Sequence, residues 1–290
     1  MKTETKRWTH LGLTAALAGT TLLSACGNSG EAGELSETGE GAITSTYSDV
    51  GEGEGEGAEA PIVEAPQDQG GEGEGGVAVE QAATDPVVFR ATLAITEAHI
   101  VAARDAFAVG ETDAAAEMFS HPVSEVLFDV GPYLQQRGVE NFDQMLLDAS
   151  DAVFDGESAE QIADRTEAII AVLRAAGEKA PDDGSSEARI QAGVAADQID
   201  RAAVMYGLAG ESEEYEPYLD GYGFAIAAKA AYDQEADAIQ AELPEAAAAI
   251  EAALAALTTA YPSVERPETL ETNPAQLTAA ASSVLLALGE

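Results

Sequence analysis

Apolar residues recur at helical spacing from residue 85 onward. The first series follows one face of a helix at intervals of three or four residues, and consists of Phe89, Leu93, Thr96, Ile100, Ala103 and Phe107. Asp85-Pro86 precedes this series as a helix cap followed by Pro in the first turn. Gly110 follows it as a residue suited to end a helix. The pattern therefore predicts a long helix over 86–109.

The helical period continues to the C-terminus, interrupted by Gly and Pro. His121-Pro122 and Gly131-Pro132 mark expected helix boundaries, because Pro disfavours a helical residue before it. No run of alternating β-branched residues predicts a strand. We therefore expect an all-α domain over 85–290, folded as an irregular antiparallel bundle of about eight or nine helices. The further helices predicted are 113–120, 123–130, 141–155, 159–176, 187–208, 218–243, 244–258 and 274–288.

Residues 27–84 differ sharply from this domain. They are rich in Gly and acidic residues, lack Lys and Arg, and include the run Gly51-Glu-Gly-Glu-Gly-Glu-Gly57. Such a segment cannot bury enough apolar surface to offset its chain entropy, so we expect a disordered tether. Its expected role is that of a spacer. A loose buffer of divalent ions is the alternative, although a flexible chain offers no fixed coordination geometry.

The N-terminus has the layout of a secretory signal. Basic residues in the first ten positions precede an apolar stretch over 11–22. The residues Leu23-Ser24-Ala25-Cys26 that follow resemble the bacterial lipobox. The resemblance implies cleavage before Cys26 and attachment of acyl chains, such as palmitate, to this residue. The predicted organisation is thus a signal peptide over 1–25, a lipidated tether over 26–84 and a helical domain over 85–290. An ordinary signal peptide or an uncleaved anchor is the alternative.

Lipidation of Cys26 would attach the protein firmly to a lipid bilayer, because two or more acyl chains hold stably where one does not. Gly27 stands where an Asp would be the usual signal for retention at the inner membrane. By resemblance to that sorting rule, we expect an outer-membrane lipoprotein facing the periplasm. Cys26 is the single cysteine, so no intramolecular disulfide can form.

The chain is strongly acidic, with a formal net charge of −40 at pH 7. Such a surface repels phosphate backbones, which argues against nucleic-acid binding. It attracts cations and basic partners, including basic proteins of the cell envelope. Solubility in a salty habitat is the alternative explanation for the acidity.

His99 and His121 are the histidines that remain after the predicted cleavage. If the helices before and after Gly110 form an antiparallel hairpin, the two imidazoles end at similar heights. Glu125 lies one turn after His121. Two imidazoles and a carboxylate suit a transition metal such as Zn, Cu or Fe. The alternative is that each histidine is a hydrogen-bonded packing residue.

The residues around His99 resemble a known motif. The stretch Ala98-His99-Ile100-Val101-Ala102 is similar to the GxHxxE motif of imelysin-type periplasmic helical proteins, which are linked to iron uptake. Ala98 replaces the Gly of that motif and Ala102 replaces its Glu. The motif is therefore not matched and the family is not assigned, although the resemblance implies metal handling.

A second unusual stretch is rich in aromatic residues. Tyr206, Tyr218 and Tyr222, together with Asp220, are candidates for the rim of a ligand pocket. Gly221 and Gly223 lie among them and cost a helix about 1 kcal/mol each relative to Ala, so a compensating role is expected. Close packing of helices at these glycines is the alternative to a pocket.

These observations favour a membrane-anchored, periplasmic binding protein whose ligand is a transition metal or another cation. The sequence contains no GxSxG, HExxH or phosphate-binding glycine loop, so we expect that the protein is not an enzyme. The alternative is a structural or interaction module of the cell envelope with no small ligand. A third hypothesis is a hydrolase that uses His99 or His121 as a base.

Overall fold

The computed structural model describes residues 80–289. The predicted signal peptide, the lipobox with Cys26, and the tether up to residue 79 lie outside the described residues. Among the described residues the regular elements are all helices and none is a strand, which confirms the expected all-α class. The helices are α1 (Pro86–Val109), α2 (Thr112–Pro122), α3 (Phe128–Gln136), α4 (Asp143–Ala152), α5 (Ala159–Gly177), α6 (Glu187–Glu211), α7 (Glu216–Gln234), α8 (Ala236–Glu242), α9 (Pro244–Ala260) and α10 (Pro274–Leu288).

Helix ends follow the capping residues expected from the sequence. The Asp85 side chain accepts hydrogen bonds from the backbone N–H groups of Val87 and Val88, at 2.8 and 3.2 Å, and so caps α1. Gly110 ends α1 in the left-handed conformation, with φ of 92°. A short 3₁₀ turn, Gln81–Ala83, precedes α1 and buries Ala82. This turn belongs to the segment that the sequence assigned to the tether.

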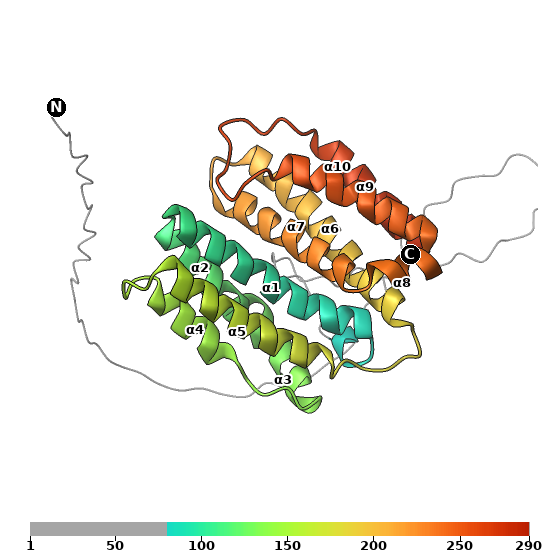
Figure 1. Ribbon diagram of the computed structural model, residues 1–290, viewed down its shortest axis with the longest axis horizontal. Coiled ribbons are helices and arrows are strands. Elements are labelled where there is room, and N and C mark those ends of the chain that lie inside the picture. The colour runs from blue at the N-terminus through green and yellow to red at the C-terminus, as the bar shows by residue number, and fades with distance from the viewer. Residues whose placement is uncertain (1–79, 290) are drawn as a thin grey trace, which may run out of the picture. The chain divides into compact units, whose positions relative to one another are not determined.

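The helices pack in two neighbouring groups (Figure 1). Helices α9 and α10 lie against α6, while α1 packs against α2 and α5 and α2 packs against α4. Helix α7 contacts both α6 and α1, and so joins the two groups. Helix α1 is long and apolar enough to cross a membrane by length and composition alone. However, 72% of that apolar window is buried inside the domain, as expected of a core helix.

Two glycines allow α7 to approach its neighbours closely. A Cβ atom on Gly223 would lie 2.4 Å from the carbonyl oxygen of Ala98 in α1, and a Cβ on Gly221 would overlap the side chain of Tyr261. Only hydrogen atoms fit in these spaces. The structure thus confirms close packing as the reason for both glycines.

Two expected helix boundaries are wrong. Helix α2 continues through His121 and Pro122 into a π-helical segment, Val123–Leu127, which leads directly into α3. Pro122 has no N–H for an α-helical hydrogen bond, and the wider π turn follows directly after it. Pro132 lies inside α3, where burial of Val130 and Leu134 holds the helix together despite the lost hydrogen bond.

The expected architecture, an all-helical bundle of about eight or nine helices, is confirmed, with one helix more among the described residues. The described residues form ten α-helices. One cause is a break at Glu235, which separates α8 from the end of α7, although a single helix over 218–243 was expected. The backbone of Glu235, with φ of −132° and ψ of 26°, lies outside the helical region.

Candidate metal centre

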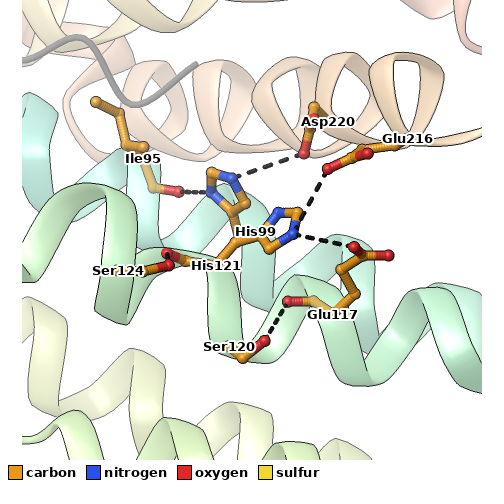
Figure 2. Close-up of polar contacts among 8 residues, drawn as sticks. All are labelled: Ile95, His99, Glu117, Ser120, His121, Ser124, Glu216 and Asp220. Atoms are coloured by element: carbon orange, nitrogen blue, oxygen red, sulfur yellow. Dashed lines mark hydrogen bonds and ion pairs between the residues drawn. The ribbon is translucent and has the colours of Figure 1, made fainter. Parts of the chain in front are cut away.

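His99 lies in the middle of α1 and is 1% exposed. Its Nδ1 atom is 2.8 Å from the carbonyl oxygen of Ile95, one turn earlier in the helix (Figure 2). A carbonyl oxygen can only accept, so Nδ1 carries the proton of this bond. In the neutral ring, the other nitrogen, Nε2, then presents a lone pair. Nε2 is buried and makes no hydrogen bond to a described residue.

The surroundings of His99 favour its neutral form. Burial is the main cause that lowers the pKa of His99, to about 4. Positive charge at His121 and Arg201 lowers this pKa further, whereas the hydrogen bond to Ile95 raises it. At neutral pH, His99 is therefore an uncharged imidazole. A neutral imidazole is the form in which histidine binds a metal. Because Nδ1 donates its proton to a carbonyl oxygen, the free lone pair is on Nε2, which is the atom that would bind the metal.

The hairpin of α1 and α2 brings His121 next to His99. The centroids of the two rings are 6.1 Å apart, with the ring planes at 69°. One ligand atom from each of His99, His121 and Glu125 lies within 4.8 Å of the other two. The structure thus brings together the three residues that the sequence suggested as metal ligands. Glu125 reaches this position from the π-helical segment, a type of turn that is frequent at functional sites.

Helix α7 adds two carboxylates to the cluster. Oδ1 of Asp220 lies 3.6 Å from Nε2 of His99, and Oε1 of Glu216 lies 3.5 Å from Nε2 of His121 (Figure 2). Oε1 of Glu117, one turn before His121 in α2, is 3.6 Å from the same nitrogen. Glu117, His121 and Glu216 form a second group of ligand atoms within 4.8 Å of one another.

These separations are suitable for metal coordination. Two ligand atoms, each about 2.1 Å from one ion, are roughly 3–3.5 Å apart at tetrahedral or octahedral angles. The three nitrogen–oxygen distances of 3.5 and 3.6 Å lie at or just above the upper end of this range, and the other ligand atoms of each group lie within 4.8 Å, so binding requires the groups to close around the ion. Imidazole and carboxylate together form a donor set suited to Zn, Fe, Cu or Ni.

The sequence did not point to Glu117 and Glu216. The spacing could have suggested them, because Glu117 lies four residues before His121 and Glu216 lies four residues before Asp220. Residues with this spacing share a helix face. Nothing in the sequence, however, indicated that these two faces meet.

The hydroxyl groups of the three tyrosines suggested for a pocket rim bond to neighbouring segments of the domain. The Tyr218 hydroxyl donates to the carbonyl of Ser263, and the Tyr222 hydroxyl donates to Asp105. The Tyr206 hydroxyl accepts from the backbone N–H of Thr272. Asp220, the fourth residue suggested for this rim, faces a histidine.

A cavity of about 270 Å³ lies elsewhere in the domain and includes no residue of the histidine cluster. It is lined by residues of α1, α5, α6 and α7, among them Arg90, Glu97, Arg174 and Glu187. None of the four residues proposed for a pocket rim lines this cavity.

The C-terminal part of the chain is similar to a known protein family. Residues 181–290 match the family model described as an iron permease-associated 4-helix bundle domain. The matched region contains α6 to α10, whose four long helices are α6, α7, α9 and α10. It includes Glu216 and Asp220 but neither histidine. No curated protein and no solved structure matches the chain significantly.

This match changes the interpretation of where the protein lies. The expected outer-membrane localisation is wrong, because iron permeases are transporters of the inner or plasma membrane. The match is compatible with a metal-related role, and it points to a component associated with transport and not to an enzyme, as expected. It gives no support to the resemblance to imelysin-type proteins or to the lipobox.

Proposed function

We propose that this protein binds a transition-metal ion at the cluster of His99, His121, Glu125 and Asp220, and handles iron in association with an iron permease. The metal is the cargo of the protein, held for transfer and not for catalysis. The observation that carries this proposal is the buried Nε2 atom of His99, which has no hydrogen-bond partner among the described residues. It is 3.6 Å from Asp220.

The chemistry of this pair favours a cation. With His99 neutral, a lone pair of nitrogen faces a carboxylate oxygen, and both groups are acceptors. Two acceptors held together in the core are unfavourable unless a proton or a metal ion lies between them. His121 and Glu125 place an additional nitrogen and oxygen within reach of the same space. A metal ion at this position would thus be coordinated by nitrogen and oxygen atoms from several residues, among them the buried Nε2 of His99.

The position of the cluster supports an association with transport. Two of its carboxylates, Glu216 and Asp220, lie within the region similar to the iron permease-associated domain, whereas the histidines come from α1 and α2. The N-terminal helices therefore supply the nitrogen ligands that the matched region lacks. For a protein that serves an iron permease, iron is the expected ion.

The N-terminus completes the proposal. We propose that acyl chains on Cys26 attach the protein to the membrane that holds the permease, with residues 27–84 as a tether. Acylation would keep the domain near the permease, and the acidic chain would attract cations to the same surface. In a Cys26→Ser variant, the protein should move from the membrane fraction to the soluble fraction. A Cys26→Ser variant that stays in the membrane fraction would contradict the anchor without bearing on the metal site.

Metal binding is tested on the purified full-length chain. Under anaerobic conditions, titration with Fe²⁺ should show stoichiometric binding by calorimetry and by metal analysis. His99→Gln and His121→Gln should each weaken this binding strongly, because each removes a nitrogen ligand while keeping a polar side chain of similar size.

The matched control tests the acidic surface. Glu268→Gln combined with Glu271→Gln removes two exposed carboxylates from the loop before α10 and should leave stoichiometric binding intact. If the histidine variants bind Fe²⁺ as the wild type does, the ion is held by the acidic surface and the proposed site is wrong. If the wild type binds no transition metal, the protein is better explained as an interaction module without a small ligand.

A further inference from the structure

We propose that the cluster has two positions for one metal ion, an outer one at Glu117, His121 and Glu216 and an inner one at His99, His121 and Glu125, with the ion passing from one to the other across the His121 ring. This inference rests on the proposed function. It adds a route by which the ion reaches the buried nitrogen of His99 and leaves it again.

The outer position is formed by the Nε2 atom of His121 and two carboxylates. Glu117 and Glu216 approach this nitrogen from different helices, α2 and α7, at 3.6 and 3.5 Å. Both carboxylates are accessible to solvent, so a hydrated ion can reach them and exchange part of its water shell for carboxylate oxygens. Figure 2 shows the two carboxylates converging on the same ring atom.

The inner position lies on the buried side of the cluster. Its ligand atoms come from His99, His121 and Glu125, with Asp220 3.6 Å from His99. The Nδ1 atom of His121 is buried and makes no hydrogen bond to a described residue. Because the outer carboxylates converge on Nε2, Nδ1 is the nitrogen that remains for the inner position.

Burial increases steadily along this series. The exposed fraction of the side chain is 55% for Glu117, 37% for Glu216, 12% for His121, 1% for His99 and 0% for Asp220. Glu216 and Asp220 are one helical turn apart in α7, and they lie at the outer and the inner position respectively. An ion that moves inward therefore exchanges an exposed position for a more buried one, in which Glu125 and His121 remain partly exposed, with a histidine nitrogen available at each position.

The chemistry of imidazole limits occupancy to one ion. A neutral imidazole has one nitrogen with a lone pair and one with a proton, so His121 coordinates through only one nitrogen at a time. When the ion moves from Nε2 to Nδ1, the Nδ1 proton is released and a proton is taken up at Nε2, which leaves the charge of the ring unchanged. The half-exposed outer carboxylates and solvent are available to carry that proton.

The test separates rates from affinity. Co²⁺, whose visible absorption reports its ligands, is mixed with the full-length protein in a stopped-flow instrument, and release is measured with an excess of chelator. Without Glu117 and Glu216, the inner site keeps its ligands but loses its route. The double variant Glu117→Gln/Glu216→Gln should therefore bind Co²⁺ about tenfold more slowly and also release it about tenfold more slowly, with a nearly unchanged dissociation constant.

A second variant isolates the outer position. His99→Gln/Asp220→Asn removes inner ligands, so it should bind Co²⁺ weakly with an altered spectrum, and this binding should disappear when Glu117→Gln and Glu216→Gln are added. Glu268→Gln/Glu271→Gln, which removes the same charge without removing a ligand of either position, should change none of these rates by more than about twofold, because salt screens exposed charges.

Each contrary result has a distinct meaning. If Glu117→Gln/Glu216→Gln leaves both rates unchanged, the outer position has no role and the inference is wrong, while the metal site remains. If release becomes faster in that variant, all the ligands form a single site and the inference is also wrong. If the wild type binds no Co²⁺, the proposed function itself fails.

Discussion

Nε2 of His99 lies 3.6 Å from Oδ1 of Asp220, and both side chains are buried where α1 crosses α7. The crossing is close because Gly223, three residues after Asp220 on α7, leaves no Cβ between its helix and the carbonyl of Ala98. Ala98 is the neighbour of His99 in α1. The same contact that packs the two helices therefore sets the distance between the imidazole and the carboxylate.

Metal binding at this crossing should stabilise the fold. At a free ion concentration about 100 times the dissociation constant, a ligand that binds only the folded state adds about 2.7 kcal/mol. For a domain of this size, the melting temperature should rise by roughly 5–10 °C. The rise should be visible by circular dichroism with Fe²⁺ under anaerobic conditions, and a chelator should reverse it. A His99→Gln variant that shows the same rise would place the ion elsewhere.

The metal-free protein should lose stability in mild acid because of His99. Burial lowers the pKa of this residue to about 4 in the folded state, against about 6.5 in an unfolded chain. Between these values the unfolded state binds the proton more readily, so the contribution of His99 is complete above pH 6.5 and is lost as the pH falls toward 4. The loss amounts to about 3 kcal/mol.

This loss is measured by urea denaturation of the chelator-treated protein between pH 7 and pH 4. The carboxylates of the domain also titrate in this range, so the comparison is with His99→Gln, which retains them. The difference in unfolding free energy between the two proteins should shrink as the pH falls. Two parallel curves would mean that the pKa of His99 is the same in the folded and unfolded states.

Much of the fold could be predicted from local sequence signals. The caps at Asp85, Ser158 and Asn273 fix where α1, α5 and α10 begin, because their side chains bind the free N–H groups of the first turn. The errors came from Pro122 and Pro132, which usually end a helix. Here the π-helical segment and the buried face of α3 keep the chain helical through both.

The close crossing of α1 and α7 can be tested with a pair of glycines. Gly223→Ala would place a methyl group 2.4 Å from the backbone oxygen of Ala98, so one helix must move. We expect a loss of about 1–3 kcal/mol, as for overpacked cores, together with weaker metal binding because Asp220 moves with α7.

The matched control is Gly207→Ala in α6. A Cβ at Gly207 meets nothing within 4 Å, and Ala favours a helix by about 0.5–1 kcal/mol. This variant should therefore be slightly more stable and should bind metal normally. If both variants behave alike in urea denaturation and metal titration, the crossing does not set the geometry of the site.

Only part of the candidate site could be predicted from the sequence. His99 and His121 could be related through the short turn at Gly110, because two adjacent helices of known length form an antiparallel hairpin. Asp220 and Glu216 belong to a helix far along the chain, and helical periodicity does not say which distant faces meet. The two faces meet because Gly223 packs closely on Ala98, and this contact depends on how the side chains of both helices fit together.

The affinity of the site for different metals should follow its donor atoms. Nitrogen and oxygen ligands bind divalent ions in the order Mn²⁺ < Fe²⁺ < Co²⁺ < Ni²⁺ < Cu²⁺ > Zn²⁺, so Cu²⁺ and Zn²⁺ should displace Fe²⁺ in competition titrations with the purified protein. Ca²⁺, which prefers oxygen ligands alone, should not displace Co²⁺ from the histidines. If Ca²⁺ competes effectively, binding takes place at carboxylates and the imidazoles are not ligands. If the expected order holds, the coordinating atoms of this cluster do not by themselves favour iron over the other divalent transition metals.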